Sequence, residues 1–169
     1  GSWKWGTGWL DQMGFYDFAG SGIVHMAGAA AAIAGVMVLG PRKGKYDKDG
    51  NSKPILGANL PLATLGTFIL WLGWFGFNVM SAATLQGISG LVAVNSLFAM
   101  AGGVIAALLI SKNDPGFIHN GALAGLVAIC AGSDQVHPVG ALAIGIIAGV
   151  IFVKGFTWEQ EKLKLDDVL

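Results

Sequence analysis

The sequence predicts an all-α protein, a polytopic bundle of transmembrane helices, on three observations. Hydrophobic residues make up 54% of the chain and charged residues only 12%, well below the roughly 25% typical of soluble domains. Glycine accounts for 27 of 169 residues without a collagen-like period, and small residues let membrane helices approach closely. Apolar segments alternate with polar connections from end to end. We therefore expect a single membrane domain over residues 1–169.

Five segments are apolar enough to be transmembrane helices, at residues 18–39, 60–83, 91–110, 118–132 and 139–153. The first three are long enough to cross a bilayer core of roughly 30 Å as helices. The last two have about 15 residues each, fewer than the usual minimum of about 17. They either borrow flanking residues to form longer helices or lie buried among other helices.

The positions of lysine and arginine predict the orientation in the membrane. The connection 41–54 carries five basic residues, and Lys112 and the tail after residue 153 carry further ones. The connections 84–89 and 133–138, which lie on the opposite side, carry none. We therefore place the tail and loop 41–54 in the cytoplasm and the N-terminus outside a cell membrane. Lysines and aspartates together predict that loop 41–54 is a flexible, hydrated stretch.

An external N-terminus normally follows a signal peptide or an earlier span, and the sequence shows neither. We therefore expect this chain to be a piece of a longer protein.

Composition and motifs argue against several classes of function. The net charge of zero gives no general attraction to nucleic acid. One cysteine cannot form an internal disulfide, and with three separated histidines it gives no metal-site spacing, so we expect no metal and no cofactor. Cys130 lies in an apolar run, where a small buried hydrophobe is the expected role. No catalytic motif is found, so the protein is not expected to be an enzyme.

Two glycine pairs predict tight helix crossings. Gly121 with Gly125 and Gly145 with Gly149 have the GxxxG spacing, one pair in each of the two short segments. This spacing lets two helix backbones approach closely.

His25 is the one ionisable residue inside the first predicted span. Asp17, Ser21 and His25 recur every four residues and share one helix stripe, which places His25 ~12 Å below Asp17 and near the middle of a bilayer. An ionisable group at that depth is a functional hypothesis by default. The alternative is a core histidine that is hydrogen-bonded to a carbonyl or to a neighbouring helix, and spacing does not decide between the two.

Asp17 immediately precedes the first apolar run. The favoured interpretation is a helix N-cap whose carboxylate also complements the helix dipole. A compatible alternative is a carboxylate that attracts a cation at the mouth of a pathway.

The second span presents Trp74, Phe77, Asn78 and Ser81 on one helix face. Aromatic faces attract a cation with roughly 0.5–2 kcal/mol, and a hydroxyl could replace part of its hydration shell. The alternative is an aromatic packing face with a polar spot for an interhelical hydrogen bond.

Two motifs resemble those of a known family. Residues 17–25 read DFAGSGIVH, an LGPR sequence follows, and residues 73–78 read GWFGFN. In order and spacing these resemble the Amt/Mep branch of the ammonium transporter family, and LAGLVAICAG and KLKLDD are similar to later segments of that family. The resemblance extends along essentially all 169 residues. It implies the middle part of a fold with about eleven spans in two inverted halves.

The resemblance implies three pore residues. His25 would be the first of a pair of pore histidines, Phe77 one of two stacked gating phenylalanines, and Trp74 a neighbouring pore-lining residue. The second histidine and the second phenylalanine of the family lie outside this chain.

The resemblance also implies an external substrate site. Trp5 and Ser81 would bind the cation there, and Asp17 would order the site. Without the resemblance, Trp5 would be assigned to an interfacial aromatic belt with its neighbours Trp3 and Trp9. Val79 and Met80 are bulkier than the residues usual in the family, and we expect them to narrow or reshape the site.

The expected function is transport of ammonium or methylammonium across a membrane through a hydrophobic, histidine-lined pore. The resemblance implies a homotrimer in a lipid bilayer, with a PII-type regulatory protein as a partner on the cytoplasmic face. Two alternatives remain: an ammonium-sensing membrane domain, and a transport-inactive structural fragment of such a transporter.

Overall fold

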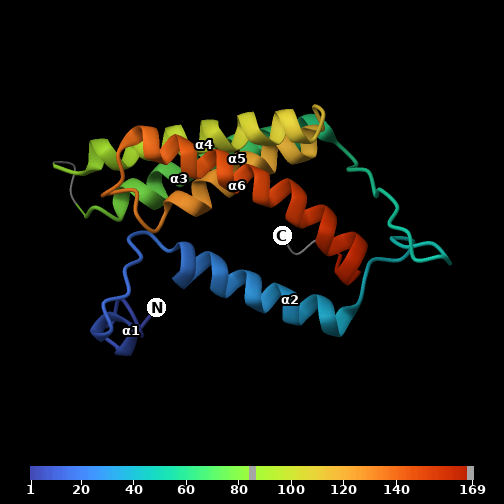
Figure 1. Cartoon of the computed structure of the whole chain (residues 1–169), viewed down its shortest axis with the longest axis horizontal. Coiled ribbons are helices and arrows are strands. Elements are labelled where there is room, and N and C mark those ends of the chain that lie inside the picture. Colours follow the sequence, from blue (N-terminus) through green and yellow to red (C-terminus); the bar gives the residue numbers. More distant parts are fainter. Residues whose placement is uncertain (84–86, 167–169) are drawn as a thin grey trace.

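The computed structural model describes residues 1–83 and 87–166, and within these ranges the chain is helical (Figure 1). The described residues contain no β-strand; their only strand-like pairing is one antiparallel bridge between Tyr46 and Ser52. The prediction of an all-α helix bundle is therefore confirmed.

The elements follow one another with these bounds: α1 Trp9–Gln12, η1 Ser21–Met26, α2 Ala27–Leu39, α3 Leu60–Met80, α4 Ser89–Ile110, α5 Pro115–Ile129, α6 Pro138–Trp158 and η2 Glu159–Leu163. In the described residues, four helical stretches are long and apolar enough to cross a membrane: Ser21–Leu39, Leu60–Met80, Ser89–Ile110 and Pro138–Leu163. The predicted span 60–83 ends three residues early, at Met80. Part of the predicted connection 84–89 and the last residues of the tail, 167–169, lie outside the described residues.

The two short predicted segments have different outcomes. The segment predicted at 139–153 borrows flanking residues, because α6 and η2 continue it to Leu163. The segment predicted at 118–132 remains a 15-residue helix, α5, with buried residues along its length. Whether α5 crosses a membrane stays a prediction.

Capping residues and prolines define the starts of three helices. Asn59, Asp114 and His137 each accept a hydrogen bond from a backbone N–H in the first turn of α3, α5 and α6. Each of these helices also has a proline in its first turn, where its missing N–H costs nothing.

Helix α4 packs against both α5 and α6 through small residues (Figure 1). A Cβ atom on Gly121 of α5 or on Gly149 of α6 would lie 2.7 or 2.8 Å from the carbonyl oxygen of Gly103, which belongs to α4. Gly125 and Gly145 meet the carbonyl of Ala99, one turn earlier on α4, in the same way. Both predicted GxxxG pairs therefore form close crossings, and α4 is their common partner.

Helix α2 lies apart from the bundle of α3 to α6 (Figure 1). No residue of the stretch Ser21–Leu39 is buried, although its sequence is strongly apolar; only a few residues near its beginning and residues 35–36 are partly buried. The bundle itself holds the buried core, with Val92, Ala99, Leu126 and Ile129 among its least exposed side chains.

The basic connection 41–54 packs on the tail that follows α6, at the end of the molecule opposite the N-terminus (Figure 1). The Arg42 guanidinium donates to both carboxylate oxygens of Asp166, at 2.8 and 2.7 Å, and the Arg42 backbone N–H donates to the same group at 2.9 Å. These hydrogen bonds lower the pKa of Asp166 to about 2 despite its burial. The Tyr46 hydroxyl donates to the Gln160 carbonyl at 3.0 Å, and the Lys164 ammonium lies 5.6 Å from the centre of the Tyr46 ring.

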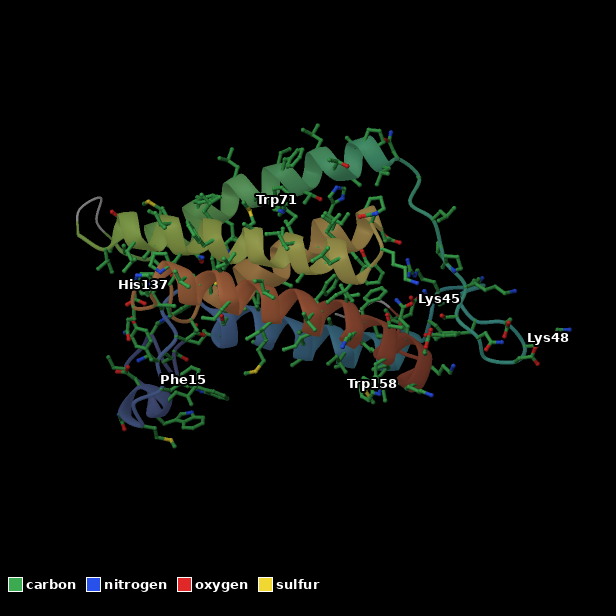
Figure 2. All side chains as sticks on the ribbon, turned by 45° about the horizontal axis from the view of Figure 1, so that its top comes forward. Phe15, Lys45, Lys48, Trp71, His137 and Trp158 are labelled. Carbon is green, nitrogen blue, oxygen red and sulfur yellow. The ribbon has the colours of Figure 1, made fainter. Side chains whose placement is uncertain are left out.

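The prediction that loop 41–54 is a hydrated stretch is therefore wrong at Lys45, whereas residues 41–44 are exposed as expected. Lys45 is only 5% exposed, and its ammonium lies 3.9 Å from Asp166. Figure 2 shows the contrast with Lys48, which extends away from the rest of the molecule at the tip of the loop. The partner of Lys45, Asp166, lies more than a hundred residues away, so the composition of the loop alone could not predict the ion pair.

Candidate functional site

The site begins at Asp17, which caps the first span. Its Oδ1 accepts the backbone N–H groups of Gly20 and Ser21 at 3.0 and 2.9 Å, and its Oδ2 accepts those of Gly22 and Ile23, both at 2.8 Å. The residue is 1% exposed. The carboxylate therefore caps the first turn as predicted, although the N-cap position itself is Gly20, three residues further on. The attraction of a cation by Asp17 stays a prediction.

His25 lies on a π-helical turn that this cap initiates. Gly20 has a φ of 118°, a conformation that suits glycine, and a Cβ there would also meet the Val24 side chain at 2.7 Å. The Gly20 carbonyl accepts the N–H groups of both Val24 and His25, at 3.0 and 3.1 Å. Short π-helical segments within α-helices occur frequently at functional sites.

The same turn is fixed to the end of α5. The N–H groups of Phe18 and Ala19 donate to the carbonyls of Ala131 and Cys130 at 3.0 and 2.8 Å. The Ser21 hydroxyl donates to the Val127 carbonyl and accepts the Ala131 N–H. The segments that carry His25 and Cys130 are therefore held together by two hydrogen bonds between main-chain groups and two that involve the Ser21 hydroxyl.

His25, Trp74 and Phe77 come together as an aromatic cluster, which brings the three predicted pore residues to one place. The imidazole stacks on the Trp74 indole with 4.9 Å between ring centres and 13° between ring planes. The Phe77 ring centre lies 5.3 Å from that of His25 and 5.6 Å from that of Trp74. These contacts join η1 to α3, which are separated in the sequence by α2 and the basic loop.

The Nε2 atom of His25 is buried and has no hydrogen-bond partner among the described residues. The alternative of a core histidine bonded to a carbonyl or a neighbouring helix therefore has no support for this atom within the part of the chain that the structure describes. A buried imidazole nitrogen without a partner is available to a small polar molecule.

Each of the predicted external residues, Trp5 and Ser81, is hydrogen-bonded to another predicted site residue. The Trp5 indole Nε1 donates to the Asp17 carbonyl at 3.1 Å, and its side chain is half exposed. Ser81 is exposed just beyond α3, and its hydroxyl donates to the Phe77 carbonyl at 2.9 Å. Hydrogen bonds to main-chain carbonyls therefore connect Trp5 with Asp17 and Ser81 with Phe77.

The sequence analysis missed a buried polar chain behind Trp74. The Trp74 Nε1 donates to the Cys130 sulfur at 3.2 Å, the Cys130 thiol lies 3.0 Å from the Asn78 side-chain oxygen, and the Asn78 amide donates to the Ser96 hydroxyl at 2.9 Å. Cys130 is therefore more than the small hydrophobe expected at its position. Asn78 and Ser96, polar residues inside apolar runs, were the available signal.

The described residues contain no group of three or more histidine, cysteine, aspartate or glutamate side chains that could hold a metal ion.

The whole chain matches the sequence profile of a family described as the Ammonium Transporter Family, over residues 1–169. Among curated relatives, the ammonium transporter Amt2 of Archaeoglobus fulgidus is 46% identical over 185 aligned residues, which cover 100% of this chain and 39% of that protein. Amt2 of Methanocaldococcus jannaschii is 49% identical over 154 residues, which cover 91% of this chain and 36% of that protein.

Solved structures show the same similarity. A structure described as a sensor Amt protein superimposes with a TM-score of 0.92 at 43% identity and covers 98% of this chain and 44% of its own. The structure of Mep2 from Candida albicans superimposes with a TM-score of 0.82 at 30% identity, over 98% of this chain and 38% of its own. This chain therefore spans about two fifths of the length of the relatives that it matches.

Proposed function

The chain belongs to the ammonium transporter family, and from that premise we propose that it forms part of a pore that passes ammonium or methylammonium across a membrane. The observation that carries the proposal is His25, whose buried Nε2 has no partner among the described residues and whose ring is stacked on Trp74 inside an apolar helix pair.

The external step uses aromatic faces. Trp5 is held by the Asp17 carbonyl with half of its side chain exposed, so its ring can attract a cation with about 0.5–2 kcal/mol. Ser81 is exposed and presents a hydroxyl oxygen that can replace one water of the hydration shell. Asp17 acts indirectly, because its carboxylate is buried and orients the turn that follows it.

In the pore step, ammonium loses a proton and continues as neutral ammonia. An ammonium ion that leaves water for the apolar surroundings of Trp74 and Phe77 loses a large hydration energy, and the neutral molecule does not. One N–H bond therefore breaks, ammonia keeps the electron pair, and the proton leaves through water or the imidazole. His25 then offers its Nε2 to the passing ammonia, and a proton moves past the same ring.

Uptake of labelled methylammonium into proteoliposomes tests this function. Two proteins are compared: this chain alone, and a chimera in which it replaces the matching segment of the Archaeoglobus fulgidus Amt2, which is 46% identical to it. We expect uptake by the chimera and its loss in the chimera with His25→Ala. His119→Ala is the matched control, because His119 lies at the start of α5, 3.5 Å from Thr64 and outside the aromatic cluster.

A chimera that inserts and folds but takes up no methylammonium contradicts the proposal, and so does a His25→Ala chimera with unchanged uptake. Uptake by the isolated chain would show that it assembles a complete path by itself. If only the chimera is active, the isolated chain is the transport-inactive fragment that the sequence analysis left as an alternative.

A sensor is the second candidate, because the solved structure with 43% identity and a TM-score of 0.92 is described as a sensor Amt protein. A sensor binds ammonium and changes conformation without a net flux. Saturable quenching of tryptophan fluorescence by methylammonium in a chimera that takes up none would favour it.

The finer features of the resemblance belong to the same proposal. We place loop 41–54 and the tail on the cytoplasmic side, because the connections at that end of the bundle carry nearly all the basic residues. A homotrimer and a PII-type regulator on that face are expected of the complete protein. Cross-linking of the chimera in membranes measures the first, and co-purification with a PII protein measures the second.

A further inference from the structure

A chain of hydrogen bonds links Trp74 to helix α4 through the interior. It runs from the Trp74 indole N–H to the Cys130 sulfur, from the Cys130 thiol to the Asn78 side-chain oxygen, and from the Asn78 amide to Ser96, at 3.2, 3.0 and 2.9 Å. The Ser96 hydroxyl donates to the Val92 carbonyl at 2.8 Å, which ends the chain on the main chain of α4. Cys130, Asn78 and Ser96 are each fully buried.

The direction of these hydrogen bonds is fixed at both ends. An indole nitrogen can only donate, so the Cys130 sulfur must accept from Trp74. The Ser96 hydroxyl gives its single hydrogen to Val92, so it must accept from the Asn78 amide, and the Asn78 oxygen then faces Cys130. The thiol hydrogen has two possible acceptors, the Asn78 oxygen and the Leu126 carbonyl, both at 3.0 Å.

Cys130 also joins the three elements of the site. Its carbonyl accepts the Ala19 N–H, which fixes the segment that leads into the His25 turn. Its sulfur holds the indole of Trp74 on α3, and that indole stacks on the imidazole of His25 with 13° between the ring planes. The main chain of one residue thus positions the histidine turn while its side chain positions the ring against which the histidine packs.

We propose that Cys130 is a positioning residue of the pore, because its thiol sets the position of the Trp74 indole and, through it, that of the His25 imidazole. The proposal rests on the proposed function for its effect on transport, but the effect on ring positions is independent of transport. A cysteine that only filled space would leave the stacking to shape alone. A cysteine that positions Trp74 must be replaceable by another small donor and acceptor, and not by an apolar side chain of similar size.

Three variants separate these roles. Cys130→Ser keeps a donor and an acceptor, Cys130→Ala removes both, and Cys130→Val fills the volume without either. Ser133→Ala is the matched control, since Ser133 is fully buried close to Cys130 in the chain and its hydroxyl has no hydrogen-bond partner among the described residues.

The readout is the proton NMR signal of the histidine rings in the chain reconstituted in nanodiscs. The chain has only three histidines, and the signals of His119 and His137 serve as internal references. A ring stacked on an indole has its signals shifted upfield, so His25 is expected upfield in the parent chain, in Cys130→Ser and in Ser133→Ala. We expect the shift to be lost in Cys130→Ala and Cys130→Val, while His119 and His137 do not change.

Methylammonium uptake by the chimera gives the functional consequence. We expect Cys130→Ala and Cys130→Val to lower uptake by about fivefold to tenfold, the factor that corresponds to one lost hydrogen bond, and Cys130→Ser to restore it. Cys130→Val keeps the test valid if Cys130→Ala does not insert. An unchanged His25 signal in Cys130→Ala or Cys130→Val overturns the proposal, whatever happens to uptake. A parent chimera that takes up no methylammonium overturns the proposed function and leaves the NMR result to decide the positioning role.

Discussion

At the scale of single residues, Asp17 stabilises the site through the hydrogen bonds that its carboxylate accepts from the main chain. One carboxylate accepts four backbone N–H groups, of Gly20, Ser21, Gly22 and Ile23, and so replaces the missing acceptors at the start of a membrane helix. In Asp17→Ala these N–H groups lose their acceptor away from bulk water. We expect a loss of roughly 3 kcal/mol or more in the free energy of unfolding.

Asp17→Asn separates the loss of hydrogen-bond acceptors from the loss of side-chain volume. The amide has nearly the same size as the carboxylate, but it keeps one acceptor oxygen and turns an NH₂ group toward two backbone donors. Thermal unfolding followed by circular dichroism in detergent is expected to rank the parent chain first, Asp17→Asn second and Asp17→Ala last. Asp49→Asn, in the exposed part of loop 41–54, serves as the charge-matched control. Equal midpoints for Asp17→Asn and Asp49→Asn would show that the cap contributes nothing.

Spacing in the sequence predicted some features of the site and could not predict others. The capping of the first turn by the Asp17 carboxylate was predicted, but Asp17 lies before the helix, which begins at Ser21 with a π-helical turn, so Asp17 does not share one helix stripe with Ser21 and His25. The sequence did not predict the stacking of His25 on Trp74, because this contact depends on how two helices far apart in the sequence pack together. The resemblance placed both residues in a pore without giving their distance.

At the scale of elements, length and composition predicted the helices, and packing decided their ends. The segment 139–153 looked too short, but α6 continues past it through Lys154 to Trp158, and η2 extends the helical stretch to Leu163. Helix α5 has only 15 residues, because it begins at the Asp114 cap with Pro115 and ends at Ile129, before Cys130. Hydropathy measures how favourably a segment is transferred into lipid. It therefore does not predict where a helix ends when that end packs against protein.

The same limit explains the error about loop 41–54. Charge predicted hydration, but a charged group with an ionic partner can be buried. Lys45 is buried beside Asp166, a carboxylate more than a hundred residues away that Arg42 binds through two hydrogen bonds. We predict that Asp166→Asn loosens the loop. Four of its five basic residues are trypsin sites, since Lys53 precedes Pro54, so cleavage in the loop is expected to become several-fold faster. Asp49→Asn is the control, and an unchanged cleavage rate for Asp166→Asn would contradict the role of this ion pair.

The pKa of Asp166 gives this ion pair a pH dependence with a definite sign. Arg42 lowers that pKa to about 2, below the roughly 3.9 of an unfolded chain, so the unfolded state binds the proton more readily. The stabilisation is complete above about pH 4 and is lost as the pH falls toward 2. Pepsin, with rates expressed relative to an unstructured peptide, should cut the loop of the parent chain faster over this interval, whereas Asp166→Asn should show no such change.

At the scale of the whole molecule, helix α2 is an apolar helix whose side chains no other described part of the chain buries. It is long and apolar, it continues the turn that carries His25, and none of its residues is buried. Water on such a surface is unfavourable by about 25 cal/mol per Å² of apolar area, so lipid or other helices must cover it. The relatives are about two and a half times as long as this chain, and their additional segments are the expected cover.

Site-directed spin labelling tests what covers α2. Residues 29–32 are four consecutive alanines, which sample every direction around the helix because successive residues turn by about 100°. Each is replaced by cysteine and labelled in turn, since the natural Cys130 is fully buried. In the isolated chain in bilayers we expect high collision rates with oxygen at all four positions. In the chimera with Amt2 we expect at least one position to be protected.

Protection in the isolated chain would contradict this expectation and would mean that α2 is covered without any further segment. Its dependence on protein concentration then identifies the cover. Protection that grows with the protein-to-lipid ratio means that a second copy supplies the missing helices, whereas protection independent of that ratio means that α2 folds back onto its own bundle. In the first case the imidazole of His25 would face a pore formed between two chains, and in the second it would be closed off by its own helix.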